Sequence, residues 1–407
     1  RHERLARAAQ RNAADESAKM GSAKVFNMII LGAFLKLKPL IDPEFMRKGL
    51  VAFVVFAVFV SQGLVAQQTG VQSTQKKPAT VSKPVSAPAP VVSQPAPKPV
   101  DYYQMLKSSE AVKRRIAVDN IGRQRNQNDI SVLINALSDT DAGVKIAAID
   151  SLGLMRAQQS ADKIILLLND KDSQVRQSAC VALGYIGDPK AQTGLIERVK
   201  NDTDNSVKMQ AILILGNMRS SGAVDSLIPL LKDKNPDMRL MSAQALGKIG
   251  DVKAAPKIQD ALSVSVEEIK NDASLKEPYR QGQYNRLISE LVKSLGELKD
   301  KSSEGKIEEL LKNDEKSVKL AAASTLGKLG NKSGLSVAKE LANDKDDTIR
   351  MQAVESLGNI GDASAIPVLE KMFNTETNNN IKESARTALY KLGWKPPQPK
   401  PVKKEIK

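Results

Sequence analysis

The apolar and polar positions in the body of the chain follow a helical period. The run "QVRQSACVALGYIGD", residues 174–188, places Val175, Ala179, Leu183 and Ile186 on one stripe of a helix. The remaining positions of the run are mostly polar or small. The pattern predicts an amphipathic helix that buries one face.

Residues on either side of this stripe predict where helices begin and end. Asp172 precedes it and can cap the helix N-terminus, and Gly187 suits the left-handed conformation that often closes a helix. Asp188 can then cap a second helix, in which Leu195 and Val199 face the first. The sequence therefore predicts a unit of two short helices.

This unit recurs along the chain. Its Leu-Gly or Ile-Gly pair ends at Gly122, Gly153, Gly184, Gly216, Gly247, Gly296, Gly327 and Gly358, and a weaker Leu389-Tyr390 follows. The steps are 31, 31, 32, 31, 49, 31, 31 and 32 residues. A fixed period of this size predicts a stack in which neighbouring units bury one another. We therefore predict an all-α fold, an α-solenoid of about nine two-helix repeats over residues 101–394.

Two apolar columns appear when the units are aligned on these glycines. The residue five positions earlier is small in eight of the units, which predicts that helices of adjacent units cross closely there: Ala117, Ala148, Ala179, Ala211, Ser242, Ala322, Ala353 and Ala385. The next column is apolar and contains Cys180, the only cysteine. A buried free thiol behaves as a small hydrophobe, so a structural role is expected for Cys180 rather than a catalytic one.

A basic column recurs eight positions before the glycine. It comprises Arg114, Lys145, Arg176, Lys208, Arg239, Lys319, Arg350 and Lys382. Six residues ahead of five of these stand Asp139, Asp170, Asp202, Asp233 and Asp344. The constant offset predicts a ladder of ion pairs and charged caps along the stack.

The segment "DKDSQVRQSACVALGYIGDPKA" and its copies resemble HEAT repeats, specifically the short HEAT-like units named after phycobilisome lyases. The resemblance covers about residues 105–394. It implies an α-solenoid that binds proteins on its inner surface. Relatives of this repeat include bilin lyases and deoxyhypusine hydroxylase, a di-iron enzyme built on His-Glu pairs.

Candidate chemistry is scarce in this sequence. The only histidine is His2, so no histidine-based metal site or general base is expected downstream of the predicted signal segment. Paired aspartates recur at every turn between units, as helix caps do, whereas a catalytic pair would be singular. We expect no enzyme activity, cofactor or metal. The predicted function is a non-catalytic scaffold for protein–protein interaction; the alternative is a lyase-type accessory that holds a client protein.

The charge distribution argues against nucleic acid as a ligand. The chain carries a formal charge of +15, but residues 101–394 carry 42 Lys and Arg against 40 Asp and Glu. Duplex binding needs a clustered basic face, and single-strand binding needs aromatic platforms, yet aromatic residues make up 3% of the chain. The expected partner is a protein of unknown identity, and the chain is predicted to be a monomer.

The segments outside the predicted solenoid suggest export. Residues 1–45 are interpreted as a non-native upstream extension, and 46–66 as a bacterial signal peptide with a charged start, an apolar middle and a small-residue end. Residues 67–100 form a disordered linker rich in Pro, Ser and Ala, and 395–407 a basic, Pro-rich tail. The expected location is the periplasm or the medium, or the membrane surface if the signal stays uncleaved.

The 49-residue step marks an insertion of 18 residues, which we place within 263–286. It carries four candidate partner-binding residues, Tyr279, Arg280, Tyr284 and Arg286, in a chain with only six tyrosines. Tyr and Arg are enriched among interface hot spots. The alternative is a lengthened helix pair whose tyrosines cover the adjoining repeats.

Overall fold

The computed structural model describes residues 100–396, and these are helical without any strand. They belong to the second of two compact units, Ala96–Lys407. The predicted upstream extension, the signal peptide, nearly all of the linker and most of the tail lie outside the described residues. No helix within 100–396 has the length and apolar character needed to cross a bilayer.

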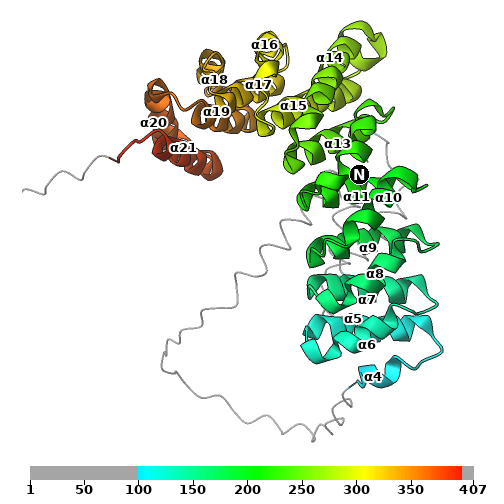
Figure 1. Cartoon of the computed structure of the whole chain (residues 1–407). Coiled ribbons are helices and arrows are strands. Elements are labelled where there is room, and N and C mark those ends of the chain that lie inside the picture. The colour runs from blue at the N-terminus through cyan, green and yellow to red at the C-terminus, as the bar shows by residue number, and fades with distance from the viewer. Residues whose placement is uncertain (1–99, 397–407) are drawn as a thin grey trace, which may run out of the picture. The chain divides into compact units, whose positions relative to one another are not determined.

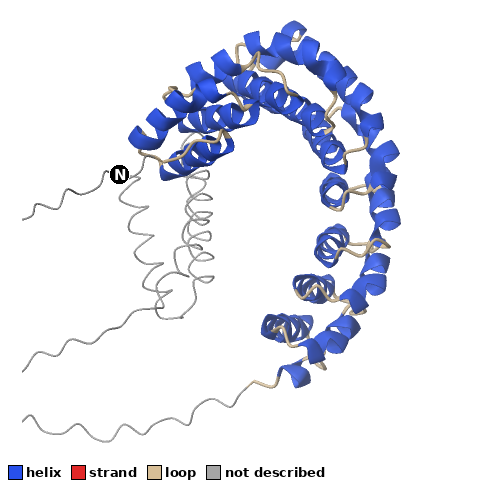
Figure 2. Ribbon diagram, turned by 60° about the vertical axis from the view of Figure 1, so that its left-hand side comes forward, coloured by secondary structure: helices blue, strands red, loops and turns tan. Residues whose placement is uncertain are grey.

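The helices that carry the Leu-Gly pairs form one layer of the stack, which we call the inner layer. It consists of α5 (Ala111–Gln124), α7 (Ala142–Leu154), α9 (Ser173–Ile186), α11 (Asn205–Asn217), α13 (Pro236–Ile249), α15 (Pro278–Glu297), α17 (Lys316–Leu329), α19 (Asp347–Ile360) and α21 (Asn379–Lys391). Consecutive helices of this layer pack directly on one another. A stack with one closely spaced layer curves toward that layer, and Figure 2 shows these described helices following a curve.

Shorter helices form the outer layer and touch their neighbours in that layer less. They are α4 (Tyr102–Met105), α6 (Ile130–Ala136), α8 (Ala161–Leu167), α10 (Ala191–Asn201), α12 (Val224–Leu227), α14 (Ala255–Asn271), α16 (Glu304–Glu309), α18 (Leu335–Leu341) and α20 (Ile366–Thr375). Short 3₁₀ turns complete several of them, such as η5 (Ile228–Lys232) after α12 and η9 (Leu310–Lys312) after α16. The predicted all-α solenoid is confirmed (Figure 1).

The predicted helix ends agree with the structure at two of three positions. The Asp172 carboxylate accepts the backbone N–H groups of Gln174 and Val175, and Gly187 ends α9 at a φ of 74°. Asp188 differs from the prediction, because it accepts the N–H of Lys190 at 2.9 Å in a turn ahead of α10 and does not cap the helix itself.

The glycines of the Leu-Gly pairs set the close approach of neighbouring inner helices. A Cβ atom on Gly153 would lie 2.8 Å from the Cα of Ala182, and one on Gly216 would lie 2.8 Å from the Cα of Ala245. The prediction had placed this crossing at the column five residues earlier. That column faces the outer layer instead, as the hydroxyl of Ser242 shows by donating to the Leu227 carbonyl of α12.

Both apolar columns lie in the core that runs between the layers. Leu215, Leu246 and Cys180 are fully buried. Burial raises the pKa of the Cys180 thiol to about 12, because the thiolate would lose its hydration. The core position predicted for Cys180 is confirmed.

The basic column forms the predicted ladder of ion pairs. Each ion pair, which we call a rung, joins a basic residue to a carboxylate of the next repeat. The Arg176 guanidinium binds the Asp202 carboxylate at 2.7 and 2.8 Å and donates to the Asp170 carbonyl at 3.0 Å. Burial opposes ionisation of Asp202, but hydrogen bonds from Arg176 and from the N–H of Asp204 outweigh it and hold the pKa of this carboxyl below its ordinary value. Arg176 therefore clamps the turn of its own repeat to the turn of the next.

Equivalent rungs cross other junctions. They are Arg114–Asp139, Lys145–Asp170, Arg239–Glu268 and Arg350–Glu376. Three junctions within residues 100–396 differ. Lys208 forms no ion pair there, and the buried Ile288 of α15 replaces the basic residue at the second. At the third, Lys316 binds the Asp344 carboxylate at 2.5 Å in place of Lys319 of the basic column.

Candidate protein-binding surface

The predicted insertion is built as a lengthened helix pair. It extends the outer helix α14 to 17 residues and the inner helix α15 to 20, against 13 or 14 for the other inner helices. The turn η7 (Ala273–Lys276) joins them, and Figure 1 shows the pair projecting beyond its neighbours. The extra residues thus prolong an existing repeat without forming a separate element.

Tyr284, one of the four predicted binding residues, packs against the preceding repeat. Its ring lies 5.8 Å from the guanidinium carbon of Arg239, which holds the Glu268 carboxylate at 2.6 and 2.9 Å. Burial raises the pKa of the Tyr284 phenol, and the charge of Glu268 adds to the shift. Tyr284 therefore agrees with the alternative interpretation of the insertion, in which its tyrosines cover the adjoining repeats.

The other three predicted residues are exposed but do not share one face. Tyr279, 65% exposed, and Arg286 lie seven residues apart on one face of α15, and the exposed Lys293 continues that face. Arg280 lies to the side, where its guanidinium donates to the Ser274 hydroxyl at 3.2 Å. The structure therefore brings Tyr279 and Arg286 together and separates them from Arg280 and Tyr284.

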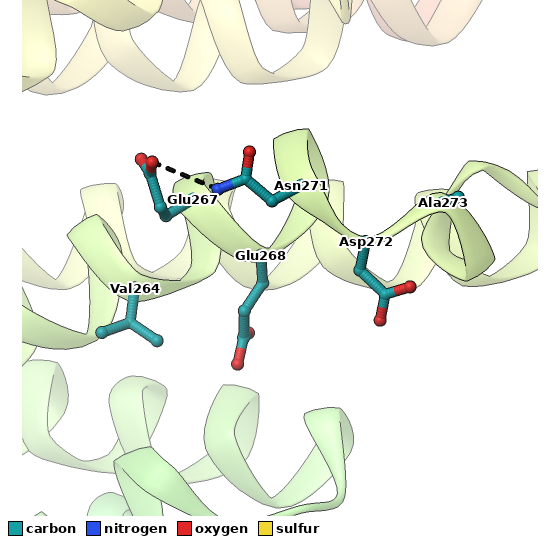
Figure 3. A pocket seen from close by; sticks show the side chains of 6 residues that line it. All are labelled: Val264, Glu267, Glu268, Asn271, Asp272 and Ala273. Atoms are coloured by element: carbon teal, nitrogen blue, oxygen red, sulfur yellow. Dashed lines mark hydrogen bonds between the residues drawn. The ribbon is translucent and has the colours of Figure 1, made fainter.

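An open groove of ≈ 630 Å³ runs beside α14 (Figure 3). Val264, Glu267, Glu268, Asn271, Asp272 and Ala273 line it. Asn271 donates to the Glu267 carboxylate at 3.2 Å, while Glu268 points to the opposite side, toward Arg239. The carboxylates of this groove therefore already have partners inside the protein.

The inner layer exposes apolar side chains that sequence analysis did not single out. Leu154 and Tyr185 follow the Leu-Gly pairs of α7 and α9 and are 56% and 51% exposed. Val181 and Leu213, three residues before the glycines of α9 and α11, are half-buried. We call these four residues the apolar patch.

Contacts at equivalent positions show that such side chains meet across the layer. The residue after the glycine is Asn217 in α11 and Lys248 in α13, and the Lys248 ammonium donates to the Asn217 amide at 2.9 Å. Leu154 and Tyr185 occupy the same position on the neighbouring helices α7 and α9. The apolar patch thus extends over three consecutive inner helices.

The surroundings of the apolar patch carry no formal charge on α9 and α11. The side chains there are Gln174, Gln177, Ser178, Ser206, Met209, Gln210 and Asn217. The basic residues of these two helices, Arg176 and Lys208, belong to the ladder column, on the other side of each helix. The central part of the inner surface is therefore uncharged in a chain of which 26% is charged.

A different surface follows on α13, α15 and α17. Lys248, Lys293 and Lys328 lie around the half-buried Glu290, and with the exposed Arg286 we call these four cations the cationic patch. Burial raises the pKa of Glu290, while the three lysines oppose that shift. The acidic side chains of this face are Glu290, Glu297 and Asp237 of α13, against four cations, so the surface remains net positive.

The described residues offer little for catalysis. Cys180 is buried, and within 100–396 no group of three or more His, Cys, Asp or Glu side chains is arranged to hold a metal ion. The histidine of the chain, His2, lies outside this range. What the geometry presents is a long inner surface with an apolar part, bordered by the carboxylate of Asp150 on α7, and a cationic part.

Comparison with known proteins identifies the repeats. The family model for HEAT repeats matches residues 102–184, 130–213, 193–275, 286–348 and 303–390, which together cover more than half of the chain. The matches leave out residues 276–285, at the tip of the insertion. No curated protein sequence matches the chain.

Many solved structures are similar to it, including the following three. The complex of CpcE and CpcF of phycocyanin lyase from Nostoc sp. PCC7120 matches at 22% identity and a TM-score of 0.45, covering 56% of this chain and 86% of that one. An engineered protein matches at 19% identity and 0.39, covering 72% and 87%. The Escherichia coli protein YibA matches at 18% identity and 0.43, covering 71% and 99%. Similarity at this level carries no information about ligand or activity.

Proposed function

Because this chain belongs to the HEAT-repeat family, we propose that it is a non-catalytic scaffold of the cell envelope that binds a partner protein on its inner layer. The observation that carries the proposal is the apolar patch. Leu154 and Tyr185 expose more than half of their surface at equivalent positions of adjacent repeats, where burial would be favourable by roughly 1.5–3 kcal/mol for a leucine side chain. A contiguous apolar surface of this kind is typical of a protein-binding site.

The non-catalytic character is part of the proposal and has its own support. The thiol of Cys180 has a pKa of about 12 and lies in the core, so it is neither ionised nor accessible near neutral pH. A lyase-type accessory differs from a scaffold in carrying a chromophore or a metal with its client. The absorption spectrum and metal content of the purified protein distinguish the two.

Export to the envelope rests on the charged, apolar and small-residue parts of segment 46–66. N-terminal sequencing of the native protein tests it, with a start near Gln67 as the expected result. A mature chain that still contains residues 1–45 would contradict export by this segment.

The binding function is tested by affinity capture from native envelope extract with the full chain as bait. We expect a specific protein on the wild type that is lost from the double variant Leu154→Ser, Tyr185→Ser. Leu166→Ser is the matched control, because Leu166 is 66% exposed on the outer helix α8. Equal retention by all three baits would reject the inner layer as the binding surface.

A further inference from the structure

The inner surface changes character along the stack in a way that indicates what the partner must carry. From α7 to α11 it presents the apolar patch, whose surroundings are uncharged on α9 and α11 and include one carboxylate on α7, that of Asp150 beside Ser178. From α13 to α17 it presents the cationic patch, with Lys248 as the first cation after the uncharged part. The two patches are adjacent, since the Lys248 ammonium reaches Asn217 beside Leu213 on α11.

A ligand of the apolar patch cannot be acidic where it contacts this surface. A carboxylate placed on Leu154, Val181 and Tyr185 would lose hydration and would lie near Asp150 with no cation to balance it, which costs several kcal/mol. Glutamine amides at the margin can bond to a peptide backbone but cannot neutralise a charge. The apolar patch therefore favours apolar and neutral side chains over acidic ones.

The cationic patch selects the opposite sign. Lys248, Lys293 and Lys328 lie on three consecutive inner helices and share Glu290, whose carboxyl is half-buried among them. Glu290 and Glu297 cannot neutralise three ammonium groups, and Arg286 adds a further cation on the exposed face of α15. Carboxylates of a ligand would thus find unused cations here, and electrostatic complementarity sets specificity and association rate.

We propose that the inner surface from α7 to α17 binds a bipartite protein segment, with an apolar part on the apolar patch and an acidic part on the cationic patch. This inference rests on the proposed scaffold function and names the chemistry of the partner. The order of the patches places the apolar part of the bound segment toward α7 and its acidic part toward α17. It does not set which part is N-terminal. Six inner helices at about 8–10 Å spacing, five steps, span roughly 45 Å, which an extended segment covers with about 15 residues.

The test is a selection of displayed random peptides of about 15 residues, the length that the span requires, against the full chain. The selected sequences should combine an apolar block with Asp or Glu, and synthetic copies should bind the wild type. The double variant Leu154→Ser, Tyr185→Ser should weaken these peptides about tenfold or more, as loss of anchor residues does. Lys293→Glu, Lys328→Glu should weaken them similarly and reduce their salt dependence.

Two outer-layer variants serve as controls, Leu166→Ser and Lys163→Glu on α8, which should leave affinity unchanged. Enrichment of basic peptides, absence of enrichment, or peptides insensitive to both inner-layer variants would overturn the inference. These results would leave the scaffold function standing if envelope capture still yields a protein that needs Leu154 and Tyr185. Failure of the capture as well would reject both.

Discussion

Two rungs of the ladder do the same task in different surroundings. Arg176 and Arg239 occupy equivalent positions of α9 and α13, and each holds a carboxylate of the following repeat with two hydrogen bonds. The side chain of Asp202 has no exposed surface, whereas that of Glu268 is 34% exposed on the lengthened helix α14. The insertion therefore preserves the ion pair between repeats, but the carboxylate of that pair is partly exposed to solvent.

The largest difference should appear when the arginine of each rung is removed. Arg176→Ala leaves Asp202 buried with Arg198, 3.4 Å away, as its remaining cation, and should cost about 3–5 kcal/mol, as breaking a buried ion pair does. Arg239→Ala leaves a carboxylate that water reaches, and should cost about 1 kcal/mol or less. Urea unfolding followed by circular dichroism measures both; equal losses would remove the distinction between the rungs.

Core substitutions should destabilise the repeats before the insertion and the repeat next to it equally, because the two regions differ in the exposure of their ion pairs and not in core packing. Leu215 in α11 and Leu246 in α13 are both fully buried. Each change to Ala should cost about 2–5 kcal/mol, the usual range for an emptied leucine site. A much smaller loss for Leu246→Ala would mean that the insertion also loosens the neighbouring core.

A third rung separates the effect of exposure from that of side-chain length. Glu376 is a glutamate like Glu268, yet its side chain is only 7% exposed. Hydrogen bonding by Arg350 lowers the pKa of Glu376 to about 2. Glu376→Gln should therefore cost about 1.5–3 kcal/mol at neutral pH, the range for hydrogen bonds to charged groups.

The sign of the pH dependence follows from that lowered pKa. The stabilisation by Glu376 is fully present above the unfolded-state pKa of about 4.3 and is lost as the pH falls toward 2. Urea midpoints of wild type and Glu376→Gln should converge over that interval. A difference that is constant from pH 7 to pH 2 would show that the carboxylate charge is not what stabilises this rung.

The smallest effect is expected at Cys180, beside the best-buried rung. Cys180→Ala removes one sulfur atom from the core and should cost about 1 kcal/mol, the scale of one buried methylene. The native thiol should also fail to react with a disulfide reagent at pH 8, because its pKa is about 12. Rapid modification without unfolding would show that Cys180 is accessible.

Periodicity made the architecture predictable but concealed how the rungs are connected. In a period of 31 residues, a position six before Lys145 is also 25 after Arg114, so Asp139 fits either pairing. Only the three-dimensional stack shows that Arg114 is the partner. The same limit applies to the alanine and glycine columns, since the crossing point depends on an angle between helices that a linear pattern does not contain.

The candidate surface was predictable only in part, for a related reason. Composition drew attention to the insertion, where Tyr279 and Arg286 do share an exposed face. Leu154, Val181 and Tyr185 lie within repeats and look like further core residues in the sequence. Their exposure follows from the helix face they occupy, which is opposite to the buried columns.

The uneven ladder also gives the stack an uneven stiffness. Each rung connects only two consecutive repeats. A force that pulls on the ends of the stack therefore acts on every junction, and the least stiff junctions stretch most. The softest links are those where Lys208 and Ile288 provide no ionic rung, since at Lys319 the neighbouring Lys316 binds Asp344 instead. These two links lie on either side of the α13–α15 pair. Stretching at the Lys208 junction would change the separation between the apolar and cationic patches, whereas stretching at the Ile288 junction would move Lys328 away from Lys293 within the cationic patch.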